Sequence, residues 1–263
     1  MSQIETPERS FLFRIKLLGI PSMEWQGQVF SLPRKQARAL VYVVGTTLQP
    51  VSRDKLVYLF WPDTPEVAAR RNLSRILSYI RQTLPQPEIL QVTKESIALN
   101  PELVWSDAAQ FMHLADLNSA GKQEEMVALY GGSFLSGFSL PNNREFDSWL
   151  TLEGQKYEQL YLTALKNLIQ TKFTAQDFLT AIQYAQQYLA IDELAEDIHQ
   201  QLIQSYAANG DRSAAMRQFE DCTLILEREL GVEPLPQTRE TYNSALSGEA
   251  SSRTKLRTKP SWT

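Results

Sequence analysis

The stretch AARRNLSRILSYIRQTL, residues 68–84, decides how the first part of the chain folds. Its apolar residues recur at the spacing of an amphipathic helix, and they are Leu73, Ile76, Leu77, Ile80 and Leu84. At about 100° per residue, the opposite face carries a polar row made of Arg71, Arg75, Ser78 and Gln82. Taken alone, such a row is more typical of a solvated helix surface than of a binding site. What the polar row does therefore depends on the sequence around it.

Two further helices are predicted immediately upstream. Residues 34–48 place apolar side chains at helical spacing, namely Ala37, Leu40, Val41, Val44 and Leu48. Residues 53–61 follow Ser52, which is a typical N-cap residue. We expect Asp63 or Thr64 to cap the third helix, which contains the stretch quoted above.

Short strands are predicted on both sides of the three helices. Residues 11–20, FLFRIKLLGI, alternate as a strand does, and Trp25 and Val29-Phe30 mark two further short strands around a Gln-Gly turn. Residues 88–92 and 96–100 predict a hairpin after the third helix. The order is therefore strands, three helices and a terminal hairpin.

A helix-turn-helix followed by a β-hairpin is a winged helix, which we assign to residues 11–100. In this arrangement the second helix of the pair presents its exposed face to the major groove of DNA, and the hairpin tip, here Lys94, can reach the adjacent backbone. The polar row lies on that second helix. Its context therefore favours contact with DNA over a merely solvated surface.

Charge is divided unevenly along the chain, whose formal net charge is −4. Residues 1–100 hold 13 Lys/Arg and 8 Asp/Glu, whereas residues 101–246 hold 9 and 21. Residues 247–263 are basic again, with 4 Lys/Arg and one Asp/Glu. A polyanion is tolerated by the first part and repelled by the second, so the two parts are expected to have different partners.

The residues expected to touch DNA follow from this arrangement. The polar row should contact base edges, with guanine the target of the two arginines. Nearby cations should contact phosphates and set orientation without reading sequence, and they are Arg34, Lys35, Arg53, Lys55 and Lys94. The basic first turn of the helix at 34–48 opposes the helix dipole, a penalty that phosphates would relieve. Trp25 and Trp61 flank the motif and are interpreted as packing anchors.

Residues 101–246 predict an all-α domain. Helical segments cover 106–120, 122–130, about 143–172 and four later stretches, with the loop GGSFLSGFSLPNN (131–143) as the main interruption. A repeat appears at an offset of 34 residues, the period of tetratricopeptide hairpins, and it aligns Leu168-Ile169-Gln170 with Leu202-Ile203-Gln204, Asp177 with Asp211 and Ala181 with Ala215. Two ordinary helical hairpins of similar length are the alternative. Stacked repeats present a groove for protein partners, and self-association is equally open.

The termini and composition set the expected compartment. Residues 1–10 and 247–263 lack apolar periodicity, so we expect a disordered N-terminus and a flexible tail or linker. The single cysteine excludes an intrachain disulfide. The N-terminus lacks a secretory apolar region, and apolar runs are shorter than the ~20 residues that span a bilayer. A cytoplasmic protein associated with the nucleoid, without membrane contact, is expected.

Catalysis has little support in the sequence. Phosphate-loop, dinucleotide and zinc-protease motifs are missing. His113 and His199 lie far apart in the sequence, in separate predicted helices, and Cys222 lies among apolar residues where a small buried side chain is expected. Carboxylates Glu193, Glu196 and Asp197 lie on a polar helix face without a partner for acid–base work. We expect no enzyme activity, cofactor, metal or small-molecule ligand.

Several segments together resemble a known family. Those in the first part, PRKQARALVYVV (33–44), VSRDKLVYLFWPD (51–63) and ARRNLSRILSYIRQTL (69–84), resemble the winged helix of SARP-type (antibiotic regulatory) activators, a relative of the OmpR-type DNA-binding domain. Those in the second part resemble the bacterial transcriptional activator domain that follows it, and they are FLSGF (134–138), FDSWL (146–150), GDRSAAMRQFEDC (210–222) and ELGVEPLPQTRETY (229–242). The likeness spans residues 11–246.

The resemblance implies a mostly α protein, in which an N-terminal α/β winged helix-turn-helix precedes a C-terminal all-α tetratricopeptide-like repeat domain. It implies a sequence-specific activator of transcription that binds promoter DNA through the third helix and contacts RNA polymerase, with a homodimer on DNA as a further expectation. By position, the polar row takes the base-reading role. The alternative is a protein-interaction adaptor whose winged helix does not bind DNA.

Overall fold

The computed structural model describes residues 12–117 and 119–247. Packing divides the chain into two compact units, residues 1–160 and 161–263, and each is described by itself. The domain boundary expected at residue 100 stays a prediction, because this division separates packing units and not sequence families. The predicted disordered N-terminus (1–10) and all of the predicted tail except its first residue lie outside the described residues.

The first unit opens with a small sheet whose strand order is β3-β2-β1-β7. Its strands are β1 (Phe13–Lys16), β2 (Ser22–Trp25), β3 (Gln28–Phe30) and β7 (Val104–Ser106). The inward residues of β1 and the residue that follows it, Phe13, Ile15 and Leu17, are fully buried, which confirms the predicted alternation. The β2–β3 turn has positive φ at both central residues, Gln26 and Gly27, as a two-residue hairpin requires.

Strand β7 is the main departure from the sequence prediction, which placed residues 101–106 at the start of the helical domain. Val104 and Ser106 pair in parallel with Phe13 and Ile15 at the start of the chain. Three residues carry no readable periodicity, and a parallel partner about 90 positions away leaves no local signal. Residues 104–106 therefore belong to the sheet of the first unit.

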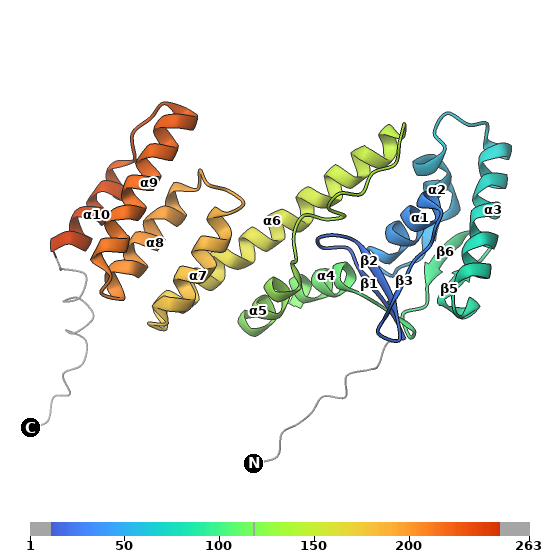
Figure 1. The fold of residues 1–263 in the computed structure, drawn as a ribbon, viewed down its shortest axis with the longest axis horizontal. Coiled ribbons are helices and arrows are strands. Elements are labelled where there is room, and N and C mark those ends of the chain that lie inside the picture. Colours follow the sequence, from blue (N-terminus) through green and yellow to red (C-terminus); the bar gives the residue numbers. More distant parts are fainter. Residues whose placement is uncertain (1–11, 118, 248–263) are drawn as a thin grey trace, which may run out of the picture. The chain divides into compact units, whose positions relative to one another are not determined.

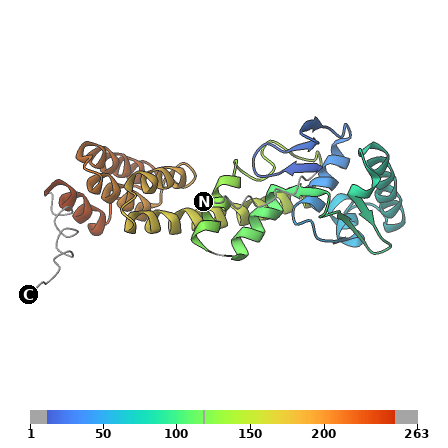
Figure 2. The ribbon, with the colours of Figure 1, turned by 90° about the horizontal axis from the view of Figure 1, so that it is seen from below.

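The predicted winged helix is present (Figure 1). Its helices are α1 (Lys35–Gly45), α2 (Arg53–Phe60) and α3 (Glu66–Thr83), and β4 (Val51–Ser52) joins β5 (Leu90–Val92) and β6 (Ser96–Leu99) in a second sheet of order β4-β6-β5. α3 lies at one edge of the first unit in both ribbon views (Figures 1 and 2).

Three details of the winged helix differ from prediction. α1 ends at Gly45, so Leu48, whose φ is +56°, lies beyond the helix that was predicted to include it. Proline explains the other two. α3 begins directly after Pro65, whose carbonyl accepts from the N–H groups of Ala68 and Ala69, so neither Asp63 nor Thr64 caps it. The first wing strand starts at Leu90 because the preceding residues form a 3-10 helix, Pro87–Ile89.

The rest of the first unit wraps the winged helix with α4 (Asp107–Leu117), α5 (Ala120–Leu129) and the start of α6 (Arg144–Thr174). The loop 131–143 runs beside the end of β1, where the Leu135 N–H donates to the Leu17 carbonyl at 2.7 Å. A Cβ at Gly131 would lie 2.8 Å from the Leu18 carbonyl oxygen, so only glycine allows this close approach. The loop thereby pairs with the residues that follow β1, through an isolated antiparallel bridge between Leu18 and Phe134.

A buried carboxylate joins β1 to α4. Asp107 accepts from the backbone N–H groups of Leu17 (2.7 Å), Leu18 (3.0 Å) and Ala108 (2.7 Å). Burial raises the pKa of Asp107, and the three amide donors oppose that rise. These bonds satisfy amide groups that have left the ladder of the sheet.

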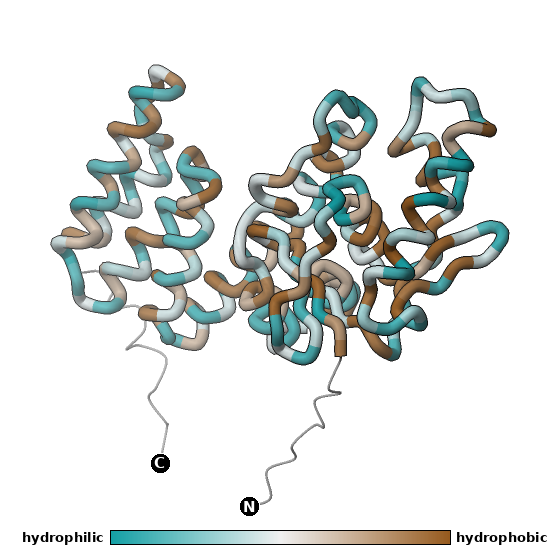
Figure 3. The backbone as a smooth tube through the Cα atoms, turned by 45° about the vertical axis from the view of Figure 1, so that its right-hand side comes forward, coloured by the Kyte–Doolittle hydropathy of each residue, from teal (hydrophilic) through white to brown (hydrophobic). Residues whose placement is uncertain are grey.

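The second unit is helical, as predicted, and contains the end of α6 with α7 (Phe178–Leu189), α8 (Glu196–Ala208), α9 (Arg212–Leu230) and α10 (Pro236–Ser247). Hydrophobic and hydrophilic residues alternate along these helices (Figure 3). One apolar cluster has Ile169, Ile182, Ile198 and Leu202 at its centre. Each helix thus buries one stripe against its neighbours.

The 34-residue repeat is a structural repeat. Asp177 and Asp211 are the N-caps of α7 and α9, and Ala181 and Ala215 are both fully buried. The turns before the two N-caps match as well. The N–H of Asp177 donates to the carbonyl of Lys172, and the N–H of Asp211 donates to the carbonyl of Tyr206, each at 2.9 Å. These matching N-caps and turns favour a repeat over two unrelated helical hairpins.

The repeat predicts opposite effects of two substitutions at one turn position. Gln176 and Gly210 are equivalent residues, with φ of +62° and +87° respectively. Only glycine adopts this left-handed backbone without strain, and a Cβ at Gly210 would meet no atom within 4 Å. In unfolding experiments on the full chain, Gly210→Gln should cost about 1 kcal/mol and Gln176→Gly should stabilise by up to about 1 kcal/mol. Changes of the same sign at both sites would contradict the equivalence.

Candidate nucleic-acid interface

α3 has one buried and one exposed face. The predicted stripe is buried, with Leu73 and Ile80 fully so, and Ile76, Leu77 and Leu84 at most 9% exposed. The polar row, Arg71, Arg75, Ser78 and Gln82, is exposed along its whole length. Burial of a Leu or Ile side chain contributes about 1.5–3 kcal/mol, so the stripe fixes how α3 is rotated. That rotation is what turns the polar row outward.

The start of α2 is attached to the base of the wing. Ser52 pairs with Ser96 of β6, and its hydroxyl accepts from the N–H of Lys55 at 3.2 Å, as predicted for an N-cap. The N–H of Arg53 donates to the carbonyl of Glu95 at 2.9 Å. Helix-turn-helix and wing are therefore one connected surface.

The side chain of Arg53 links the wing to α3. Its guanidinium donates to the Thr93 carbonyl and to the Ser74 hydroxyl, each at 3.4 Å. Ser74 lies beside the polar row and itself donates to the carbonyl of Arg70 at 2.9 Å. Arg53, predicted only as a phosphate contact, thus also links the wing to α3.

Arg70 joins the two helices of the motif. Its guanidinium contacts Glu66 one turn earlier at 2.8 Å and Asp54 on α2 at 2.7 Å. Because all three side chains are largely exposed, each pair contributes only about 0–1 kcal/mol. The two carboxylates balance the charge of Arg70. The positive charge available on the outer face of α3 therefore comes from the polar row and the cations beside it.

Arg34 is held beside the polar row by an aromatic ring. Its guanidinium carbon lies 4.1 Å from the ring centroid of Tyr79 on α3, a cation–π geometry. An open hollow on this surface is lined by Arg34, Ser74 and Tyr79 together with the polar row. The N-terminus of α1 and the outer face of α3 therefore form one concave, cationic surface.

The remaining predicted cations are placed differently. Lys35 lies over the ring of Phe138 at 5.5 Å, against the loop 131–143 and not in the hollow. Lys55 is exposed on the first turn of α2, and Lys94 is exposed at the wing tip. The sequence did not single out Ser74 or Tyr79, although both follow the polar row at helical spacing. Tyr79 carries an apolar ring and Ser74 is one of many exposed serines, so neither gave a distinctive signal.

The helix-turn-helix rests on residues from the loop and α6. The amide of Asn143 donates to the Leu59 carbonyl at 3.1 Å, and its oxygen accepts from the N–H of Phe146 at 2.9 Å. One side chain therefore satisfies the end of α2 and the start of α6. Phe146 is fully buried and its ring lies 5.9 Å from that of Phe60 on α2. This packing holds the end of α2 through residues that do not line the hollow.

His199 and Cys222, two of the residues considered above for catalysis, are buried in the second unit. His199 is buried, with Nε2 2.9 Å from the Glu193 carbonyl and Nδ1 2.7 Å from the Gln218 amide. Burial raises the pKa of the Cys222 thiol to about 12, so it stays protonated. In the part of the chain that the structure describes, no cluster of three or more His, Cys, Asp or Glu side chains suits a metal ion.

None of the helices in residues 12–117 and 119–247 combines the length and the apolar character that crossing a bilayer requires.

Comparison with known proteins identifies the family. The model of the bacterial transcriptional activator domain matches residues 110–246, more than half of the chain. The fold is similar to that of Mycobacterium tuberculosis EmbR, solved in complex with a low affinity phosphopeptide, with a TM-score of 0.64 and 16% sequence identity over 93% of this chain and 69% of that chain. No curated protein sequence matches the chain.

The fold similarity includes the winged helix, whereas the family match lies in the residues that follow it. Together they confirm the predicted fold class and the resemblance to SARP-type transcriptional regulators. The chain belongs to the bacterial transcriptional activator domain family.

Proposed function

We propose that this transcriptional activator binds promoter DNA sequence-specifically, with α3 in the major groove and the wing against the neighbouring backbone. The observation that carries the proposal is the exposed polar row on the second helix of the motif, with Arg34 held beside it by Tyr79. A winged helix that served only as a protein contact would not need this concentration of guanidinium groups around one helix. The surrounding first hundred residues are also the basic part of the chain.

The polar row has a suitable length for reading bases. From Arg71 to Gln82 the helix rises about 16 Å, which corresponds to roughly five base pairs. Arg71 and Arg75 are assigned to guanine edges, where a guanidinium donates two parallel bonds. Ser78 and Gln82 are assigned to base edges further along the groove.

Other cations orient the domain by contacting phosphates. Arg34, Arg53, Lys55 and Lys94 surround α3 on α1, α2 and the wing, so they can contact the backbone on both sides of the groove. Lys35 is a weaker candidate, because its ammonium must first leave the ring of Phe138.

The helical repeats are assigned to protein contacts in the cytoplasm, either with RNA polymerase or with a second protomer on DNA. Residues 101–246 are strongly acidic, with 9 Lys/Arg against 21 Asp/Glu. DNA phosphates repel such a surface, whereas a basic protein surface attracts it. Binding to DNA is therefore left to the first hundred residues.

Binding to duplex DNA at two salt concentrations tests the proposal. The full chain should bind duplexes selected from a random library, and its affinity should fall by about 10³-fold or more between 50 and 200 mM salt if six or more phosphates are contacted. Genome-wide mapping of bound sites would supply the natural operators. If the chain ignores duplex DNA even at low salt, it is an adaptor and the proposal fails.

Arg75 should be specific for one base pair. Replacing it with Ala should cost about 1–3 kcal/mol of binding free energy on the selected site and relax the preference at one position. Arg81, exposed on the same helix but outside the hollow, is the matched control, and Arg81→Ala should leave base preference unchanged. An equal loss of affinity on every sequence would instead assign Arg75 to a phosphate.

Arg34 and Lys35 are adjacent in sequence but differ in position, so they should differ in effect. Arg34→Ala should weaken binding on all sequences alike and reduce the slope of log affinity against log salt by about one. Lys35→Ala should change that slope by much less, because Lys35 lies against Phe138. A larger effect of Lys35 would show that the hollow is not the phosphate-facing surface.

A further inference from the structure

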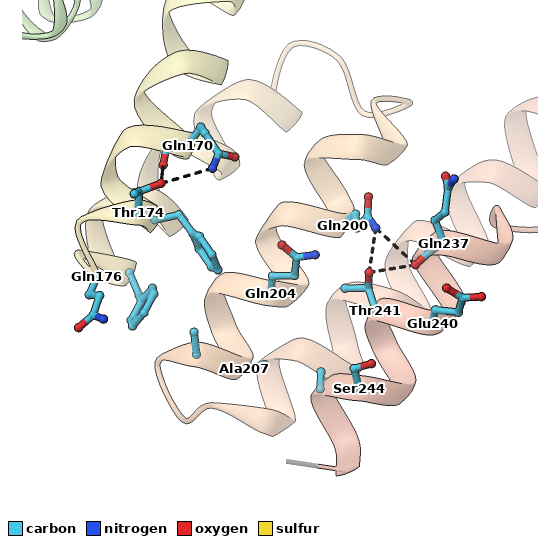
Figure 4. A pocket seen from close by; sticks show the side chains of 14 residues that line it. Gln170, Thr174, Gln176, Gln200, Gln204, Ala207, Gln237, Glu240, Thr241 and Ser244 are labelled. Atoms are coloured by element: carbon cyan, nitrogen blue, oxygen red, sulfur yellow. Dashed lines mark hydrogen bonds between the residues drawn. The ribbon is translucent and has the colours of Figure 1, made fainter. Parts of the chain in front are cut away.

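A groove of about 760 Å³ lies among the helices of the second unit (Figure 4). It is lined by the end of α6, the turn into α7 and its first residue, α8 and α10, and five of its side chains are amides: Gln170, Gln176, Gln200, Gln204 and Gln237. The polar row and its hollow lie on the first unit, so the DNA-binding proposal leaves this groove without a role.

The amides give the groove the chemistry of a peptide-binding surface. The Gln200 amide is already engaged with Thr241, to whose hydroxyl it donates at 2.8 Å, whereas Gln204 points into the groove from the middle of α8 (Figure 4). A glutamine both donates and accepts, which matches the N–H and C=O groups of an extended peptide backbone. At the rim, the half-buried rings of Phe173 and Phe178 lie 5.5 Å apart and offer an apolar contact.

Charge restricts what kind of peptide fits. Among the described residues that line the groove, Glu240 is the one charged side chain. Residues 161–247 as a whole hold 6 Lys/Arg against 12 Asp/Glu. An acidic peptide or a nucleic acid is repelled by this surface, and a basic peptide is attracted.

A basic segment of the chain begins where the groove ends. Ser244 and Ala245 line the groove, α10 ends at Ser247, and residues 248–263, which lie outside the described residues, carry four cations. Arg253, Lys255, Arg257 and Lys259 occupy every second position, with Leu256 between them. In an extended chain this spacing would put the four cations on one face and Leu256 on the other.

We propose that residues 248–263 bind in this groove as an extended peptide. The backbone contacts the glutamine side chains, the cations lie toward Glu240 and the acidic surroundings, and Leu256 contacts the Phe173–Phe178 pair. The six residue steps from Ser247 to Arg253 span up to about 20 Å, enough to turn back from the end of α10. A partner peptide that uses the groove must then displace this segment.

Because residues 248–263 belong to the same chain as the groove, they can occupy it even if the free peptide binds weakly. A short flexible link gives an effective concentration on the order of 1 mM. If the free peptide has a Kd of about 0.1 mM, roughly nine chains in ten hold their own segment, and an added peptide meets an apparent Kd about tenfold higher.

Competition in the full chain tests the proposal. The probe is a fluorescein-labelled synthetic peptide of residues 248–263, followed by anisotropy. It should bind the unaltered chain about tenfold more weakly than a chain whose own segment carries Lys255→Glu and Arg257→Glu. Equal binding to the two chains, or no binding to the altered one, would overturn the proposal.

Groove variants show where the probe binds. In the altered chain, Gln204→Arg and Glu240→Lys should each weaken probe binding at least fivefold. Glu220→Lys makes the same charge change at an exposed α9 position outside the groove, and it should have little effect. If Glu240→Lys and Glu220→Lys weaken binding equally, the attraction is general and the groove is not the site. Thermal unfolding shows whether each variant is folded. Because Glu240 is exposed, Glu240→Lys should fold normally, and it tests the groove even if Gln204→Arg does not fold.

Discussion

The burial of the apolar stripe of α3 is the constraint on which the orientation of the exposed polar row depends. Turning the helix by one residue would expose Leu73 and Ile80, each of which contributes about 1.5–3 kcal/mol by being buried. The exposed ion pairs of Arg70 contribute at most about 1 kcal/mol each, so they cannot oppose that preference. Packing therefore determines the orientation of the polar row, and the ion pairs only adjust it.

Aromatic packing joins α4, the loop 131–143 and α6 within the first unit. Tyr157 of α6 is fully buried, with its ring 5.1 Å from Phe134 of the loop and 5.6 Å from Phe111 of α4. Asn143 then ties the start of α6 to the end of α2. The proposed contact with base edges requires support of this kind, because loosely held side chains read bases poorly.

The two parts of the chain differ in charge as well as in fold. The basic winged helix suits a polyanion, whereas the acidic repeats suit protein or basic peptide partners. The amide groove extends this contrast, since its lining offers hydrogen bonds without the cations that phosphates need. Transcription regulators need both kinds of surface, one for the operator and one for the proteins they recruit.

The sequence by itself determined most elements whose signal is local, although it placed the N-cap of α3 at Asp63 or Thr64 and the structure has Pro65 there. The period of α3, the N-cap Ser52 and the 34-residue repeat can all be read from nearby residues, because helix geometry and capping depend on near neighbours. Only the tertiary structure decided what distant residues do together. It placed β7 beside β1, Arg34 over Tyr79 and Lys35 against Phe138, since such contacts join residues far apart in the chain and leave no periodic trace.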